Sequence, residues 1–140
     1  MLLALVALAL AAEAARIPAA TRARREAEAE LIFRGLEYAD AIARFRDAGG
    51  DAPVLPPDID ALLEDRRDGG MRRHLRRAWP APPEGDWHPV AGPDGGIGGM
   101  RLTIPVPALR RAALPPGVTV ETGDGVSVWT FVAAQPDTPN

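Results

Sequence analysis

Few residues in this chain have the types and spacing that chemistry at a site requires. His74 and His88 are the only histidines, and neither lies in an HExxH or similar metal-ligand spacing. Ser127 is the only serine; it falls inside a strand pattern and has no GxSxG turn around it. Because there is no cysteine, thiolate catalysis and cysteine-bound metals are excluded. The sequence therefore predicts no catalytic residue, no bound metal and no enzymatic function.

Two loop features could hold a cofactor. The glycine-rich segment GPDGGIGG lacks the GxGxxG order that opens a helix, and the chain has no lysine for a P-loop. Its composition is that of a hairpin turn, so no nucleotide cofactor is predicted. Asp86, Asp94 and Asp124 fall in or beside predicted loops and could contribute to a calcium shell, although DxDxDG spacing is absent. Calcium stays open, without a motif to support it.

Arginine is concentrated between Arg66 and Arg77, where six arginines and one aspartate give 6 − 1 = +5. The rest of the chain carries 10 − 18 = −8. Such a segment can contact the phosphates of nucleic acid or anionic lipid. It can also pair with carboxylates such as Glu64 and Asp65, or with those of a neighbouring subunit. No aromatic row interleaves the arginines as single-strand binding requires, so no nucleic acid is predicted. The predicted contact patch is Arg72, Arg73, Arg76 and Arg77.

The elements that must position these residues begin with one long helix. The opening residues, MLLALVALALAA, are uncharged, and strong helix formers run without proline from Ala19 to Ala48. A helix from Leu2 to Ala48 would be about 70 Å long, which exceeds the width of a domain of this size, so its first half must project. Pro18 predicts a bend. The side chains predicted to enter a membrane or to drive assembly are Leu2, Leu3, Leu5, Val6, Leu8 and Leu10.

The rest of this helix changes character twice. Residues 21–30, TRARREAEAE, alternate small and charged side chains and are predicted to stay out of any core. An apolar stripe follows, in which Gly35 lies among four residues predicted to pack on a head. The chain is therefore divided into 1–30, an apolar membrane or filament helix with a polar neck, and 31–140, the head with the second half of the helix. The four head-packing residues are Leu31, Tyr38, Ile42 and Phe45.

The head is predicted to be an α+β structure of a single domain. Gly49 and Gly50 end the long helix, a short helix follows Pro57, and a second is predicted over residues 70–79. Two hairpins follow, and one face of their three- or four-stranded antiparallel sheet packs on the long helix. The expected fold is thus a long N-terminal helix packed on a small antiparallel sheet, with one or two short helices. The predicted strands are 86–91, 97–104, 118–121 and 126–132.

An alternative for the N-terminus is a cleaved signal peptide. The apolar run has the length of a signal-peptide core, and Ala12, Glu13 and Ala14 form a small-x-small cleavage site. Cleavage there would release a soluble periplasmic binding module. No basic residue precedes Leu2, and the polar neck does not suit an ordinary core helix, so the anchored helix is favoured.

The order of these parts resembles the type IV pilin-like proteins, specifically the pseudopilins of type II secretion systems. The segment REAEAELIFRGLEYADAIARF is similar to the region where a pilin helix enters its head. The stretches ALLEDRR, RRHLRRAWPAP and GDWHPVAGPDGGIGGM are similar to the head of one branch of these proteins. The resemblance covers about Leu2 to Met100 and does not extend to a particular C-terminal region.

This resemblance implies a structural subunit in the bacterial inner membrane with its head in the periplasm. It implies polymerisation through the N-terminal helix, with other pseudopilin subunits and the inner-membrane secretion platform as partners. The family's basic leader and cleavage-site glycine do not precede Met1. Either the start codon lies upstream, which we expect, or the protein has lost processing by prepilin peptidase. Prepilin peptidase is a partner only if that leader exists. The remaining alternatives are the released periplasmic module and a binder of anionic surfaces through residues 66–77.

Overall fold

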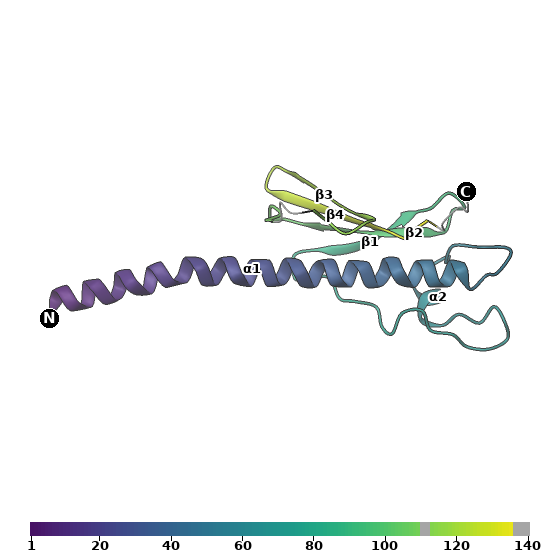
Figure 1. Cartoon of the computed structure of the whole chain (residues 1–140), viewed down its shortest axis with the longest axis horizontal. Coiled ribbons are helices and arrows are strands. Elements are labelled where there is room, and N and C mark those ends of the chain that lie inside the picture. The colour runs from purple at the N-terminus through teal and green to yellow at the C-terminus, as the bar shows by residue number, and fades with distance from the viewer. Residues whose placement is uncertain (110–112, 136–140) are drawn as a thin grey trace.

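The computed structural model describes residues 1–109 and 113–135 and has the predicted α+β fold, shown in Figure 1. A very long N-terminal helix is followed by one short helix and then by the strands of a small antiparallel sheet. The elements are α1 (Leu2–Asp47), α2 (Asp60–Leu63), β1 (Asp86–Ala91), β2 (Ile97–Ile104), β3 (Val118–Gly123) and β4 (Val126–Val132).

Helix α1 is continuous over 46 residues and passes through Pro18. Its N-terminal half projects well beyond every other element and curves gently, without a sharp kink (Figure 1). At the other end, Arg44 and Arg46 lie in the last turn, where positive charge is favourable to the helix dipole. The helix ends where the sequence predicts, because Gly50 takes a positive φ of 62° that few other residues tolerate.

The sheet has the strand order β1-β2-β4-β3, and every neighbouring pair is antiparallel. It lies along one side of the C-terminal half of α1, whereas α2 and most of the connection from α2 to β1 lie on the other side (Figure 1). The loop between α1 and α2 reaches the sheet, where Ile97 N donates to Pro56 O at 2.8 Å. Both hairpins form where the sequence predicts. In the second, Asp124 and Gly125 have φ values of 51° and 78°, the left-handed pair that a two-residue hairpin turn requires.

The core lies between α1 and the inner face of the sheet and continues on the other side of α1 through Leu62 and Leu75. The four predicted head-packing residues Leu31, Tyr38, Ile42 and Phe45 are all buried. Strand β4 alternates as a half-buried strand should, with one set of side chains turned toward the helix and the other outward. The buried side chains of this face on β2 and β4 include Met100, Leu102, Ser127, Trp129 and Phe131.

Gly35 allows the closest approach between α1 and the sheet. A Cβ atom at this position would overlap the ring of Phe131, which is fully buried and has no room to move. We expect Gly35→Ala to lower the free energy of unfolding by about 1–2 kcal/mol, because overpacking outweighs alanine's better helix propensity. Denaturant unfolding of the full chain in neutral detergent micelles measures the change.

The control for Gly35→Ala is the same substitution in a Phe131→Leu background. Leucine lacks two of the three overlapping ring carbons, Cε1 and Cζ, so Gly35→Ala should then cost less than it does in the unaltered chain. The double-mutant cycle isolates the contact. Stabilisation by Gly35→Ala in the unaltered chain would contradict the close approach.

The predicted helix over residues 70–79 is wrong, and the segment is irregular. Its backbone bonds are directed to distant partners: Asp65 and Arg72 exchange both backbone hydrogen bonds, and Leu62 O accepts from the amides of His74 and Leu75. A segment of this length, bounded by glycine and proline, gains too few internal bonds to repay helix nucleation. Only α2 forms among the predicted short helices within the described residues.

Candidate functional site

The apolar end of α1 is the most unusual surface of the molecule. Six large aliphatic side chains there are each at least half exposed, and the rest of the chain covers none of the helix's most apolar 18-residue window. By length and composition, α1 is the one helix among the described residues that could span a membrane, a test that a signal sequence also passes. Burial of each such side chain elsewhere would contribute about 1.5–3 kcal/mol. The side chains are Leu2, Leu3, Leu5, Val6, Leu8 and Leu10.

The neck that follows is more closely tied to the head than its sequence predicts. Arg24 Nη2 donates to Pro107 O at 3.0 Å, and Leu109 N donates to Glu28 Oε1 at 3.2 Å. Two charged side chains of a segment expected to be only solvated therefore hold a loop against the helix. The signal could not be read from the sequence, because the bonded groups are 83 and 81 residues apart.

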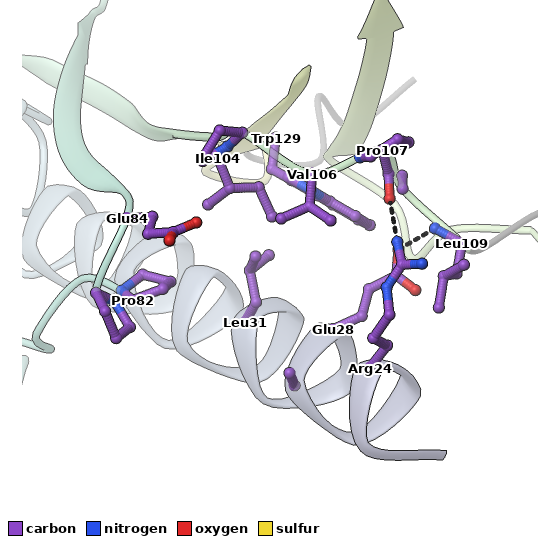
Figure 2. A pocket seen from close by; sticks show the side chains of 14 residues that line it. Arg24, Glu28, Leu31, Pro82, Glu84, Ile104, Val106, Pro107, Leu109 and Trp129 are labelled. Atoms are coloured by element: carbon purple, nitrogen blue, oxygen red, sulfur yellow. Dashed lines mark hydrogen bonds between the residues drawn. The ribbon is translucent and has the colours of Figure 1, made fainter. Parts of the chain in front are cut away.

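An apolar cavity lies where the neck, the turn before β1 and the loop after β2 meet. Figure 2 shows Leu31 pointing from α1 toward Ile104, Val106 and Trp129, with Pro82 and Glu84 at one side. Its volume is about 340 Å³, near the lower end for small-molecule pockets. Its charged residues lie at the margin, and two of them make the contacts with the loop just described.

The only serine of the chain supports this cavity. Ser127 Oγ donates to Val106 O at 2.7 Å, and the same oxygen accepts from Trp129 Nε1 at 3.2 Å. Ser127 is fully buried, so its hydroxyl fixes the loop and the indole and is not presented to a substrate. The cavity can accommodate apolar groups, but these residues offer no activated nucleophile for a reaction.

The basic segment is partly neutralised within the chain. Three arginines make ion pairs with nearby acids: Arg66 with Glu64 at 3.0 Å, Arg67 with Asp65 at 2.7 Å, and Arg72 with Asp68 at 2.8 Å. Intramolecular pairing with Glu64 and Asp65 is what the sequence predicts. In the part of the chain that the structure describes, the three other arginines have no acidic partner. They are Arg73, Arg76 and Arg77, and all are exposed.

Asp65 is the centre of a buried polar network that anchors this segment. Its carboxylate accepts from Arg67 Nε at 2.9 Å and Nη2 at 2.7 Å, and it lies 2.9 Å from His74 Nε2. Arg67 Nη2 also donates to Phe45 O in the last turn of α1 at 2.7 Å, and the guanidinium lies over the Phe45 ring. These contacts cap the C-terminal end of the long helix.

The hydrogen bonds from Arg67 hold the pKa of the Asp65 carboxyl well below its usual range. Burial opposes this shift, and the bond from His74 adds to it. The same pairing raises the pKa of Arg67. The network therefore remains an ion pair at neutral pH, with a structural role.

A cleft of about 760 Å³ opens between α1 and residues 73–79. It contains the three unpaired arginines together with Arg44, whose Nη2 donates to His74 O at 2.8 Å. One acid, Glu37, lies in the same cleft, so its net charge is 4 − 1 = +3. The indole of Trp79 forms part of the wall, with Arg77 4.3 Å from its ring centroid.

The other residues singled out in the sequence lie apart. His74 is committed to Asp65, whereas His88 is exposed and lies 3.8 Å from Asp86. Asp94 and Asp124 lie in turns of different hairpins. Within residues 1–109 and 113–135, no group of three histidines, aspartates or glutamates could hold a metal ion.

The structure shows a pilin-like arrangement, in which a long N-terminal helix is followed by a small antiparallel sheet. Comparison with protein-family models, curated proteins and solved structures finds no match to this chain.

Proposed function

We propose that this chain is a structural subunit of a pilin-like filament, of the pseudopilin type found in type II secretion systems. In this function α1 anchors the chain in the bacterial inner membrane, the head lies in the periplasm, and copies assemble through their N-terminal helices. The partners are other pseudopilin subunits and the inner-membrane secretion platform. The observation that carries the proposal is the exposed apolar end of α1, continuous with the helix that builds the core of the head.

The physical support is the cost of leaving that end in water. An α-helix satisfies its own backbone hydrogen bonds, so this segment suits hydrocarbon without further partners. Sister helices can cover the same side chains when subunits pack together. The head is already complete, since Leu31 to Phe45 fill its core without help from residues 1–20. The two parts therefore have separate roles, the first in anchoring and assembly and the second in forming a folded head.

The first experiment locates the mature protein and its N-terminus. The chain is expressed with its native upstream region in a bacterial host, and the protein is recovered from membrane and periplasmic fractions for intact mass measurement. We expect it in the membrane fraction with the apolar segment attached. A soluble periplasmic product that begins near Ala15 would contradict the proposal and favour the released binding module.

The second experiment tests assembly. Because the chain has no cysteine, single substitutions such as Leu5→Cys or Leu8→Cys introduce unique thiols into the apolar end. Mild oxidation in membranes should give disulfide-linked dimers from these positions, because assembled helices would be in contact. Ala20→Cys, which lies on the same helix beyond the apolar end, provides a comparison for random collision. Equal and low cross-linking at all three positions would contradict helix-mediated assembly.

A further inference from the structure

The head has two surfaces of opposite charge. On the side of α1 turned away from the sheet, residues 64–79 hold six arginines and three acids, and each acid is already paired. The three arginines that remain, Arg73, Arg76 and Arg77, all line the cleft that also contains Arg44. The positive charge is therefore concentrated at one place.

The cleft faces away from the sheet for a geometrical reason. Gly35 meets the sheet at Phe131, and Phe33 and Glu37 each lie two positions from it on the helix. Two positions on an α-helix correspond to about 200° of rotation, so the α1 residues of the cleft lie on the opposite side. Figure 1 agrees, since the connection containing residues 73–79 lies across α1 from the sheet.

The acidic surface is at one end of the outer face of the sheet. Asp86 pairs with Thr103, Thr103 with Val128, and Val128 with Glu121, so the two acids lie in one row across all four strands. Directly paired residues point to the same face, and both acids are exposed. Asp124 lies in the adjoining β3–β4 turn and is also exposed. We call Asp86, Glu121 and Asp124 the acidic end. Arg101 is exposed on the same face in the adjacent row, so the net charge there is 1 − 3 = −2.

These two surfaces cannot meet within one chain, because α1 and the sheet separate them. Two copies related by a head-to-tail displacement can bring the cleft of one against the acidic end of the next. Such a contact joins different surfaces of identical chains, so it leaves one of each surface open at the ends and can repeat along a filament. Each exposed ion pair is weak, so its effect is on the register and orientation of the contact, while the helices supply most of the association.

Anionic lipid is the less suitable partner for the cleft. The uncharged apolar run ends at Ala12, so the membrane boundary of an anchored chain lies before Pro18. Phe33, the cleft residue nearest the N-terminus, lies 33 − 18 = 15 residues beyond Pro18. At about 1.5 Å per residue this places the cleft about 22 Å farther along α1, whereas charge is screened over about 8 Å at physiological ionic strength. The cleft of an anchored chain is therefore beyond the electrostatic reach of headgroups.

We propose that the arginine cleft binds the acidic end of a second copy of this chain and so fixes the register between adjacent subunits. This inference rests on the proposed filament function. The complementary groups are Arg73, Arg76 and Arg77 on one copy and Asp86, Glu121 and Asp124 on the other.

The experiment uses the full chain in neutral detergent micelles and unique thiols beside each surface. Ala78→Cys lies next to the cleft and Thr122→Cys next to Glu121; both positions are exposed and the chain has no other cysteine. The two single-cysteine chains are mixed under mild oxidation, and the rate of the mixed disulfide is measured. Adding Arg76→Glu and Arg77→Glu to the first chain should slow it about tenfold or more, because like charges then face one another.

Two controls define the result. Glu121→Arg with Asp124→Arg on the second chain should slow the reaction similarly, and combining both reversed chains should restore the rate. Arg66→Glu with Arg72→Glu makes the same change in net charge outside the cleft and should change the rate less than about twofold. The proposed contact would be overturned if the rate of disulfide formation falls in each reversed chain but is not restored when the two are combined. An equal fall in rate for the Arg66 and Arg72 control would also overturn it.

The remaining outcomes separate this inference from the proposed function. An unchanged rate in the Arg76 and Arg77 variant overturns the contact between heads. Cross-linking through Leu5→Cys would then still support assembly through the N-terminal helices. If that variant also loses retention on heparin while its rate is unchanged, the cleft binds an anionic polymer and not a second copy. A chain that forms neither helix nor head cross-links overturns both proposals.

Discussion

Replacing Leu5 and Leu8 with arginine is expected to release this chain from the membrane. Both side chains are about two-thirds exposed on the apolar end of α1, at 64% and 69%, so the substitutions disturb no packing in the head. An arginine near the centre of a spanning helix costs about 2.5–3.5 kcal/mol on insertion scales, and two cost about 5–7 kcal/mol. The fraction of protein retained in membranes after carbonate extraction measures the effect.

The matched control for this double substitution is Leu5→Ile with Leu8→Ile. It keeps the apolar character and the side-chain volume, so membrane retention should not change. Unfolding of the head should be the same in both variants, because residues 2–10 contribute nothing to its core. Full membrane retention of the arginine variant would contradict the anchoring role of this segment.

Replacing Asp65 with alanine is expected to destabilise the head by about 3 kcal/mol at neutral pH. The carboxylate is 4% exposed, and its removal takes the anionic acceptor from both Arg67 and the buried His74. Loss of one partner from a buried ion pair typically costs about 3–5 kcal/mol, and partial exposure of Arg67 places this case at the lower end. Denaturant unfolding of the full chain in micelles, followed by tryptophan fluorescence, measures the change.

The same network predicts how stability depends on pH. The pKa of Asp65 is lowered in the folded chain, so the folded state binds this proton less readily than the unfolded state. The stabilisation is therefore fully present above the unfolded pKa of about 3.9 and is lost as the pH falls toward the folded value. Asp65→Ala should remove this acid-dependent component, so the difference between the two chains should shrink below about pH 4.

Asp68→Ala is the control, because Asp68 pairs with Arg72 in the same loop but is 55% exposed. An exposed pair contributes about 0–1 kcal/mol, so this variant should differ little from the unaltered chain. A pH-independent difference for Asp65→Ala, or equal losses in both variants, would contradict the role assigned to the buried network.

The features that the sequence predicts well are set by local rules. Glycine at 49 and 50 ends α1, and the alternation along β4 separates Trp129 and Phe131 from its outward valines. The two-residue turn at Asp124 and Gly125 fixes the second hairpin. The stripe from Leu31 to Phe45 identifies the helix face that packs on the sheet. In each case a few neighbouring residues determine the result.

The features that the sequence predicts poorly depend on groups that are far apart along the chain. The 70–79 segment has a helical pattern, but backbone partners at Leu62 and Asp65 offer it bonds that a short isolated helix cannot match. The cavity beside the neck forms only when Arg24 and Glu28 hold a loop more than eighty positions away. The arginine cleft likewise depends on ion pairs, because only the arginines that have no acidic partner among the described residues line it together with Arg44. No periodicity in the sequence contains these pairings.

In the proposed function a single helix is both the membrane anchor and part of the core of the head, and this has a mechanical consequence. No flexible linker separates the apolar end of α1 from the head, so a tilt of that end also tilts the head. Over about 70 Å of helix, a tilt of about 10° displaces the far end by roughly 12 Å. Within the 46 residues of α1, Pro18 is the one interior site that lacks an amide hydrogen to donate, so elastic bending should concentrate there. A lateral force on the head should therefore bend α1 mainly near Pro18, in the third of the helix nearest its N-terminus.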